Sequence, residues 1–153
     1  MARYWIVVGG PEIFGKTKEL GFTRHGFKST RRNMAKNVLP GDKMAFYITG
    51  KKQFAGVVEI TEPMVEDRTR VWQSSKNLEE LYPFRVGIKP ELILDEPDWL
   101  DAEPYHDRFS WTQKWPRAHW TLAYQGNLHE VPEADFTLLA KDLGQAARHE
   151  RAG

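Results

Sequence analysis

Residues 38 to 60 limit the possible folds of this chain more than any other stretch. A Pro-Gly-Asp turn at 40–42 leads into the apolar run 44–48, and the polar segment 49–53 leads into a second apolar run, 54–60. Two apolar runs of strand length joined by a short polar turn predict a β-hairpin. The hairpin carries aromatic side chains and a basic tip, which favours a small barrel with a ring-lined concave face.

Further strands and helices are predicted on both sides of the hairpin. Strands are expected where short segments are mostly apolar, and a loop is expected where glycine and polar residues gather. The predicted strands span residues 4–8 and 84–94, with a closing strand at 120–124. Short helical segments are predicted at 12–18 and 31–38, and residues 21–30 are predicted to form a loop.

A longer helix is predicted at the C-terminal end, over about 132–148. Pro132 suits the first helical position, and Glu133 and Asp135 lie in the first turn, where the helix dipole favours negative charge. Apolar residues then recur at helical spacing and form a single stripe. They are Phe136, Leu139, Ala140, Leu143 and Ala147.

Five strand-like runs with helices at the margins predict one α+β domain over residues 1–153. The length is sufficient for a single hydrophobic core, and no repeat or Pro/Gly/Ser-rich linker divides the chain. No apolar run approaches the roughly 18 residues of a membrane-spanning helix, and the N-terminus lacks the pattern of a signal peptide. We therefore expect no membrane association and a cytoplasmic location.

The charges of this nearly neutral chain are unevenly distributed. Residues 1–52 contain eleven Lys and Arg against three Asp and Glu, whereas residues 53–153 contain eleven against eighteen. A positive face on a neutral protein is what a polyanionic ligand requires. The alternative is that the two parts of the chain neutralise each other across the fold.

Motifs of common catalytic and cofactor sites are absent from the sequence. The glycine spacings of dinucleotide- and phosphate-binding loops do not occur, nor does the serine-hydrolase elbow. The five histidines are dispersed, and without cysteine there is no thiolate ligand or nucleophile. Acidic residues concentrate at 91–107, without the spacing of a calcium-binding loop. We expect a protein that is not an enzyme and that uses no cofactor and no metal.

Aromatic residues are the remaining candidates for a binding site. The chain has six tryptophans, and most large rings are expected in the core. A ring next to glycine or to a polar residue can instead stack on a nucleobase. The candidates are Phe22, Tyr47, Phe84 and Trp111.

Five segments, taken in order, resemble a known family. They are ARYWIVV at 2–8, GFTRHG at 21–26, LPGDKMAFYITG at 39–50, FAGVVEI at 54–60 and YPFRVGIKPELIL at 82–94. Together they are similar to the EVE domain of the PUA-like superfamily, a relative of the YTH domain, and the likeness extends to about Leu139. The resemblance implies a twisted mixed sheet forming a pseudo-barrel with flanking helices. It also implies binding of DNA or RNA that carries a modified cytosine or adenine.

Matched segment by segment, the resemblance places a base pocket at the end of the first strand. There the two glycines leave backbone groups accessible. The base-binding residues it implies are Gly9, Gly10, Phe22, Arg24, His25, Tyr47, Ile48, Thr49, Phe84, Arg85 and Trp111. Nearby basic residues are expected to hold phosphates without reading sequence. These are Lys28, Arg31, Arg32, Lys51 and Lys52.

One departure from the YTH domain leaves the identity of the modified base open. Phe and Tyr occupy the segments that match the YTH aromatic cage, where relatives carry tryptophan. Alternatives also stay open for the function. They are an RNA-binding accessory factor of RNA modification or processing, a partner-binding role, and an enzyme on a nucleotide-like small molecule with His25 or Asp42 as acid or base. Asp42 fits a cap of the turn before the strand better than a catalytic group.

Overall fold

The predicted hairpin lies in the middle of a mixed seven-stranded sheet in the computed structural model, which describes residues 1–152. Its strands are β3 (Lys43–Ile48) and β4 (Gln53–Glu66), which pair antiparallel. β1 (Tyr4–Gly9) runs parallel to β3 on the other side. A parallel pair needs a long crossover connection, and residues 10–42 supply it.

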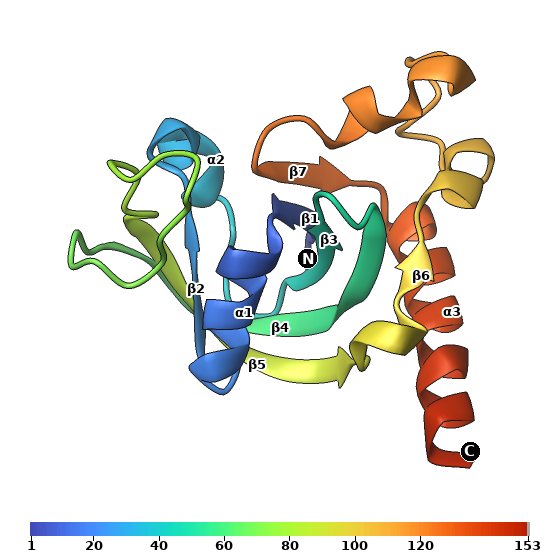
Figure 1. The fold of residues 1–153 in the computed structure, drawn as a ribbon, viewed down its shortest axis with the longest axis horizontal. Coiled ribbons are helices and arrows are strands. Elements are labelled where there is room, and N and C mark those ends of the chain that lie inside the picture. The colour runs from blue at the N-terminus through green and yellow to red at the C-terminus, as the bar shows by residue number, and fades with distance from the viewer. Residues whose placement is uncertain (153) are drawn as a thin grey trace.

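The sheet order is β2-β5-β4-β3-β1-β7, and β6 pairs with the start of β4. The remaining strands are β2 (Arg24–Phe27), β5 (Phe84–Ile93), β6 (Leu100–Asp101) and β7 (Leu128–Val131). β4 and β5 shift register in several places as they pair. Such irregularities increase strand bending. The sheet accordingly curls into a half-barrel around the N-terminal strand (Figure 1).

Helices cover this curled sheet on different sides. The α-helices are α1 (Pro11–Glu19), α2 (Arg32–Ala35) and α3 (Glu133–Ala152). Short 3₁₀ segments are η1 (Ser29–Arg31), η2 (Glu96–Asp98), η3 (Glu103–Asp107) and η4 (Arg117–Tyr124). In Figure 1, α1 lies over the inside of the curl, whereas α3 packs outside it beside β6. The expected α+β class with a twisted mixed sheet and flanking helices is confirmed.

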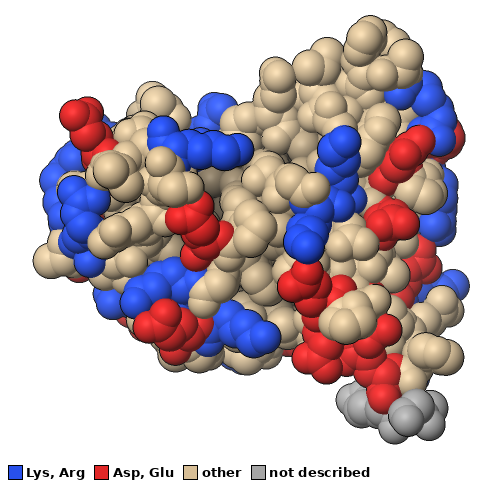
Figure 2. Space-filling model, viewed as in Figure 1, with Lys and Arg blue, Asp and Glu red and all other residues tan. Residues whose placement is uncertain are grey.

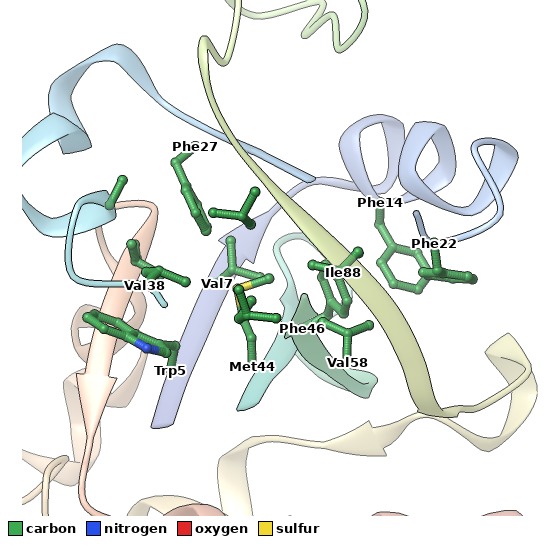
Figure 3. Packing of buried hydrophobic residues seen from close by; sticks show 14 of the residues in the cluster. Trp5, Val7, Phe14, Phe22, Phe27, Val38, Met44, Phe46, Val58 and Ile88 are labelled. Atoms are coloured by element: carbon green, nitrogen blue, oxygen red, sulfur yellow. The ribbon is translucent and has the colours of Figure 1, made fainter. Parts of the chain in front are cut away.

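Two hydrophobic clusters pack against opposite faces of β3. Phe46 and Ile48 belong to the cluster under α1, and Ala45 and Tyr47 belong to the cluster under α3. The division follows the alternation of side chains along a strand. Figure 3 shows the first cluster, in which rings from α1 and the sheet meet side chains of β5. In the second, α3 contributes most of its predicted stripe: Phe136, Leu139, Leu143 and Ala147 are buried.

Two predicted elements are wrong. Part of the predicted loop 21–30 forms β2, which pairs antiparallel with β5. The strand was not predicted because Gly26 interrupts the strand pattern. Glycine is needed at this position, since a Cβ on residue 26 would lie 2.5 Å from the Tyr82 carbonyl oxygen. The predicted strand 120–124 is instead the end of η4, and β7 takes the closing place beside β1. The sequence did not reveal β7 because its four residues, two of them polar or charged, are too few to show the alternation typical of a strand.

Candidate functional site

A cleft of about 980 Å³ opens where β1 ends and α1 begins. Its other walls are the turn between β3 and β4, the loop 71–83, the segment after β2 and the connection between η4 and β7. These segments are far apart in sequence and meet because β1 and β3 run parallel and end at the same edge of the sheet. The carboxyl ends of parallel strands are a recurrent place for ligand sites.

The mouth of the cleft is formed by backbone. Thr49 N donates a hydrogen bond to Gly9 O at 2.9 Å, which ties the two strand ends together. A Cβ on Gly10 would lie 3.5 Å from Thr49 Oγ1, an ordinary contact distance. Gly10 is therefore not required by packing, and its lack of a side chain keeps the mouth open.

Two stacked tyrosines border the inner part of the cleft. The rings of Tyr47 and Tyr124 lie 4.0 Å apart with an interplanar angle of 5°, and both line the cleft. Burial raises the pKa of Tyr47 to about 12 and also raises the pKa of Tyr124, so both hydroxyls stay protonated at neutral pH. The Tyr124 hydroxyl has no hydrogen-bond partner among the described residues. The inner part of the cleft is therefore neutral, and little of either ring is exposed, since Tyr47 is 3% and Tyr124 is 4% exposed.

The rim of the cleft is basic. Four lysines line it from three different segments: Lys28, Lys51, Lys52 and Lys76. Lys51 forms an ion pair with Glu96 at 2.9 Å, whereas the other three pair with no described carboxylate. In Figure 2, blue side chains stand over the β3–β4 turn and near α2, on either side of an uncharged area. Red side chains gather most densely at the lower right, directly below the central blue group, and a smaller red group lies to the left of the uncharged area.

Two carboxylates within the lining are occupied by hydrogen bonds. Glu80 accepts from the backbone and hydroxyl of Ser29 and from the backbone N–H of Tyr82. Glu12 accepts from the backbone and hydroxyl of Ser75. Both interactions fasten the loop 71–83 to the rest of the molecule. Both carboxylates keep their negative charge, so the lining has four lysines against two glutamates and remains positive by a smaller margin.

Seven of the predicted site residues meet at this cleft. They are Gly9, Gly10, Lys28, Tyr47, Thr49, Lys51 and Lys52. Three predicted aromatic or apolar residues lie in the core instead: Phe22, Ile48 and Phe84. The Phe22 ring packs 5.7 Å from Phe14 (Figure 3), and Ile48 points away from its neighbour Tyr47 because strand side chains alternate.

His25 also lies in the core, with 2% of its surface exposed. Its Nδ1 lies 2.7 Å from Thr17 Oγ1, which accepts a hydrogen bond from Trp72 Nε1 at 2.9 Å. Burial lowers the pKa of His25 to about 3, so the ring is neutral at physiological pH. The three side chains join α1, β2 and the loop 71–83.

Asp42 occupies a structural turn. Its carboxylate accepts hydrogen bonds from Arg3 N, Trp5 Nε1 and Leu39 N, and it lies outside the cleft lining. The expected capping role is confirmed. Neither His25 nor Asp42, the candidates for acid or base catalysis, borders the cleft.

The two predicted arginines of β2 and β5 flank Trp72. The Arg24 and Arg85 guanidinium carbons lie 5.8 and 5.0 Å from its ring centroid. Arg85 is 2% exposed and donates to the carbonyl oxygens of Leu81 and Tyr82 at 3.1 Å, and also to that of Thr69. It therefore holds the loop between β4 and β5 rather than reaching the cleft.

The remaining predicted residues lie beside or behind the cleft. Trp111 packs behind Tyr124 and stacks on His129 with centroids 5.7 Å apart. Arg31 lies against Gly126, a lining residue with φ of 81°, where a Cβ would collide with the guanidinium. Arg32, on α2, is exposed and does not line the cleft.

Sequence reasoning missed the cleft residues of two segments. Tyr124, Gln125 and Gly126 come from the connection to β7, and Lys76 and Tyr82 come from the loop 71–83. An aromatic residue followed by a glycine turn was the available signal for Tyr124, but it lay in a segment predicted as strand.

The described part of the chain offers neither a cluster of metal ligands nor a membrane-spanning helix. Within residues 1–152, no group of three or more His, Asp or Glu side chains is placed to hold a metal ion. Among the described helices, none has the length and apolar character needed to cross a membrane.

Comparison with known proteins places this geometry in context. A family model described as the EVE domain matches residues 3–141. The UPF0310 protein PH1033 of Pyrococcus horikoshii is 26% identical over 153 residues, covering 92% of this chain and 98% of that protein. The UPF0310 protein PYRAB08750 of Pyrococcus abyssi is 27% identical, covering 89% and 96%.

Two solved structures with a similar fold contain nucleic acid. The YTH domain-containing protein mmi1 in complex with RNA has a TM-score of 0.70 at 12% identity, covering 99% of this chain and 87% of that one. Human THYN1 in complex with DNA containing 5-methylcytosine has a TM-score of 0.60 at 13% identity, covering 93% and 98%. At these identities the likeness establishes a shared fold.

Proposed function

This chain belongs to the EVE domain family, and we propose that it is a non-enzymatic nucleic-acid-binding module that recognises a modified base in the cleft at the end of β1. The observation that carries the proposal is the combination of a tyrosine-bordered cleft with a rim of lysines from separate segments. The presence of RNA in the mmi1 complex and of 5-methylcytosine DNA in the THYN1 complex supports it.

The cleft is large enough to admit a base that has left its stack together with its sugar and phosphate. Its volume of about 980 Å³ lies at the upper end of the range for small-ligand sites. Extruding a base from a duplex costs a few kcal/mol, which contacts to its face and edges must offset. The small exposed part of Tyr47 offers an aromatic contact, and the Thr49 hydroxyl and the backbone beside Gly9 offer polar contacts to the edge of the base.

Selectivity for the modification rests on shape. One buried methyl group contributes only about 1 kcal/mol. Discrimination between modified and unmodified bases therefore depends on how closely the walls fit around that group and on the hydrogen bonds that fix the orientation of the base. The lysine rim binds phosphates and adds affinity without sequence preference.

Binding of short oligonucleotides to the purified protein tests the proposal. DNA and RNA strands with and without a single modified cytosine or adenine, and a folded RNA in both forms, are titrated in fluorescence anisotropy at two salt concentrations. We expect tighter binding to one modified strand, weakened by salt. Undetectable binding to every strand would overturn the proposal, whereas equal binding to folded RNA with or without the modification would favour the RNA accessory role.

A further inference from the structure

A second hollow, of about 530 Å³, adjoins the cleft. Lys51 and Lys52 line both, so the β3–β4 turn forms a ridge between them. On its far side the hollow is lined by Asp101, Glu103, Pro104, Asp107, Arg117 and Trp120. A strand whose modified base occupies the cleft would pass over this ridge.

Trp120 gives the hollow an aromatic wall that is supported from behind. The residue lies on η4, is partly exposed, and packs its ring against Tyr124 at 6.1 Å and 81°. Tyr124 in turn stacks on Tyr47 of the cleft. A continuous group of three rings thus runs from one site to the other and holds the Trp120 ring in place.

The charges of the hollow differ from those of the cleft rim. Arg117 forms ion pairs with Glu103 at 3.5 Å and Asp107 at 3.4 Å. Asp101 accepts a hydrogen bond from Gln53 Nε2 at 2.9 Å. Beyond the ridge the carboxylates therefore outnumber the single arginine, which disfavours a phosphate there. Carboxylates do accept hydrogen bonds from exocyclic amino groups of bases such as cytosine N4.

We propose that this hollow binds the nucleobase that flanks the modified one, with preference for a base bearing an exocyclic amino group. The base stacks on Trp120, its amino group donates to the carboxylates, and the linking phosphate lies on Lys51 and Lys52. The inference rests on the proposed function and extends it from one base to two.

The test uses oligonucleotides with one modified base and a varied neighbour. Cytosine, thymine and an abasic residue are placed on either side of it, and affinities are measured by anisotropy for the wild type, Trp120→Leu and Trp115→Leu. Trp115 is the matched control. It is a partly buried tryptophan just before η4, its ring centroid lies 4.4 Å from Lys114 Nζ, and it does not line the hollow. Circular dichroism and thermal melting check that all three proteins are folded.

On one side of the modified base, we expect cytosine to bind at least about 5-fold more tightly than an abasic neighbour, with thymine between them. Trp120→Leu is expected to abolish this difference, and Trp115→Leu to retain it. An abasic neighbour that costs nothing on either side would overturn the inference while leaving the proposed function intact. Equal binding of cytosine and thymine would overturn the amino preference, and failure of every oligonucleotide to bind would overturn both proposals.

Discussion

Neighbouring residues on one strand serve different purposes in this protein. Tyr47 and Ile48 are both buried, at 3% and 1% exposure, but they face opposite sides of the sheet: Tyr47 borders the cleft, whereas Ile48 packs under α1. Gly10 and Gly26 show a similar contrast, since one faces an open cleft and the other lies against a carbonyl oxygen. At the residue scale, backbone direction and local space decide the role of each side chain.

The pH dependence of stability should contain a contribution from His25. Its pKa falls from 6.5 to about 3 on folding, so below pH 6.5 the unfolded chain binds a proton that the folded one does not. This contribution is fully present above pH 6.5 and is lost as pH falls toward 3, reaching a loss of about 1.4 kcal/mol at pH 5.5. Urea unfolding at pH 7.5 and 5.5 measures it.

Substitution of the histidine isolates that contribution. His25→Gln should be less stable than wild type at pH 7.5, because the hydrogen bond to Thr17 is disturbed. Its loss of stability between pH 7.5 and 5.5 should be smaller than that of wild type by about 1.4 kcal/mol. Identical pH profiles for the two proteins would show that His25 is not buried and neutral.

The two glycines provide a second prediction. Gly10→Ala should change stability by no more than about 1 kcal/mol in either direction, since φ of −79° and ψ of 173° suit alanine, whereas alanine is a poorer N-cap of α1 than glycine. It should also weaken binding of a modified oligonucleotide, because the methyl group enters the mouth of the cleft. Gly26→Ala should cost about 1–3 kcal/mol in urea unfolding because its Cβ overlaps Tyr82. A Gly10→Ala protein with unchanged affinity would argue against this mouth as the entrance.

At the scale of elements, α3 holds the segment between η3 and η4 in place. Asp135, in the first turn of α3, accepts hydrogen bonds from Ser110 N, Ser110 Oγ and Trp111 N. The carboxylate thereby holds the segment that leads to Tyr124 and Trp120. A helix outside the curled sheet thus positions aromatic residues of the cleft and of the adjoining hollow.

Asp135→Asn should destabilise the protein by about 1–3 kcal/mol. One carboxylate oxygen would become an NH₂ group, which cannot accept the hydrogen bonds that the N–H groups of Ser110 and Trp111 now donate. Glu133→Gln is the matched control. Glu133 lies in the same helical turn but is exposed and accepts one hydrogen bond, from the Tyr4 hydroxyl, so its substitution should change stability by no more than about 0.5 kcal/mol. Equal effects in thermal melting would mean that only the helix dipole is involved.

At the scale of the whole molecule, the charge asymmetry of the sequence becomes a local arrangement. Acidic residues of the later part neutralise some cations of the first 52 residues, as in the pairs of Lys43 with Glu59 and Glu91. The lysines that stay without a described partner include Lys28 and Lys52 on the cleft rim. Part of the basic excess is therefore neutralised across the fold, and part of it remains as a positive rim of the cleft.

Lys52→Ala should weaken oligonucleotide binding to a similar extent for all sequences and reduce the salt slope by about 1, as expected for one lost phosphate contact. Lys89→Ala is the control, because Lys89 lies on β5, pairs with Glu59 at 3.5 Å and is outside the cleft. Affinities measured at several salt concentrations give both slopes. If the salt dependence of affinity is unchanged in Lys52→Ala, Lys52 does not contact phosphate.

The sequence alone determined the hairpin, the first strand and the amphipathic helix, because apolar periodicity and turn residues are local properties. The family resemblance predicted a base pocket at the end of β1; the structure brings Gly9, Tyr47 and Thr49 together at a cleft there, and base binding stays a prediction. Only the tertiary structure decided that Phe22, His25 and Phe84 are core, and that Tyr124 and Lys76 join the cleft. These outcomes depend on how the sheet curls and on which distant loop packs beside it, and neither is encoded in the spacing of neighbouring residues.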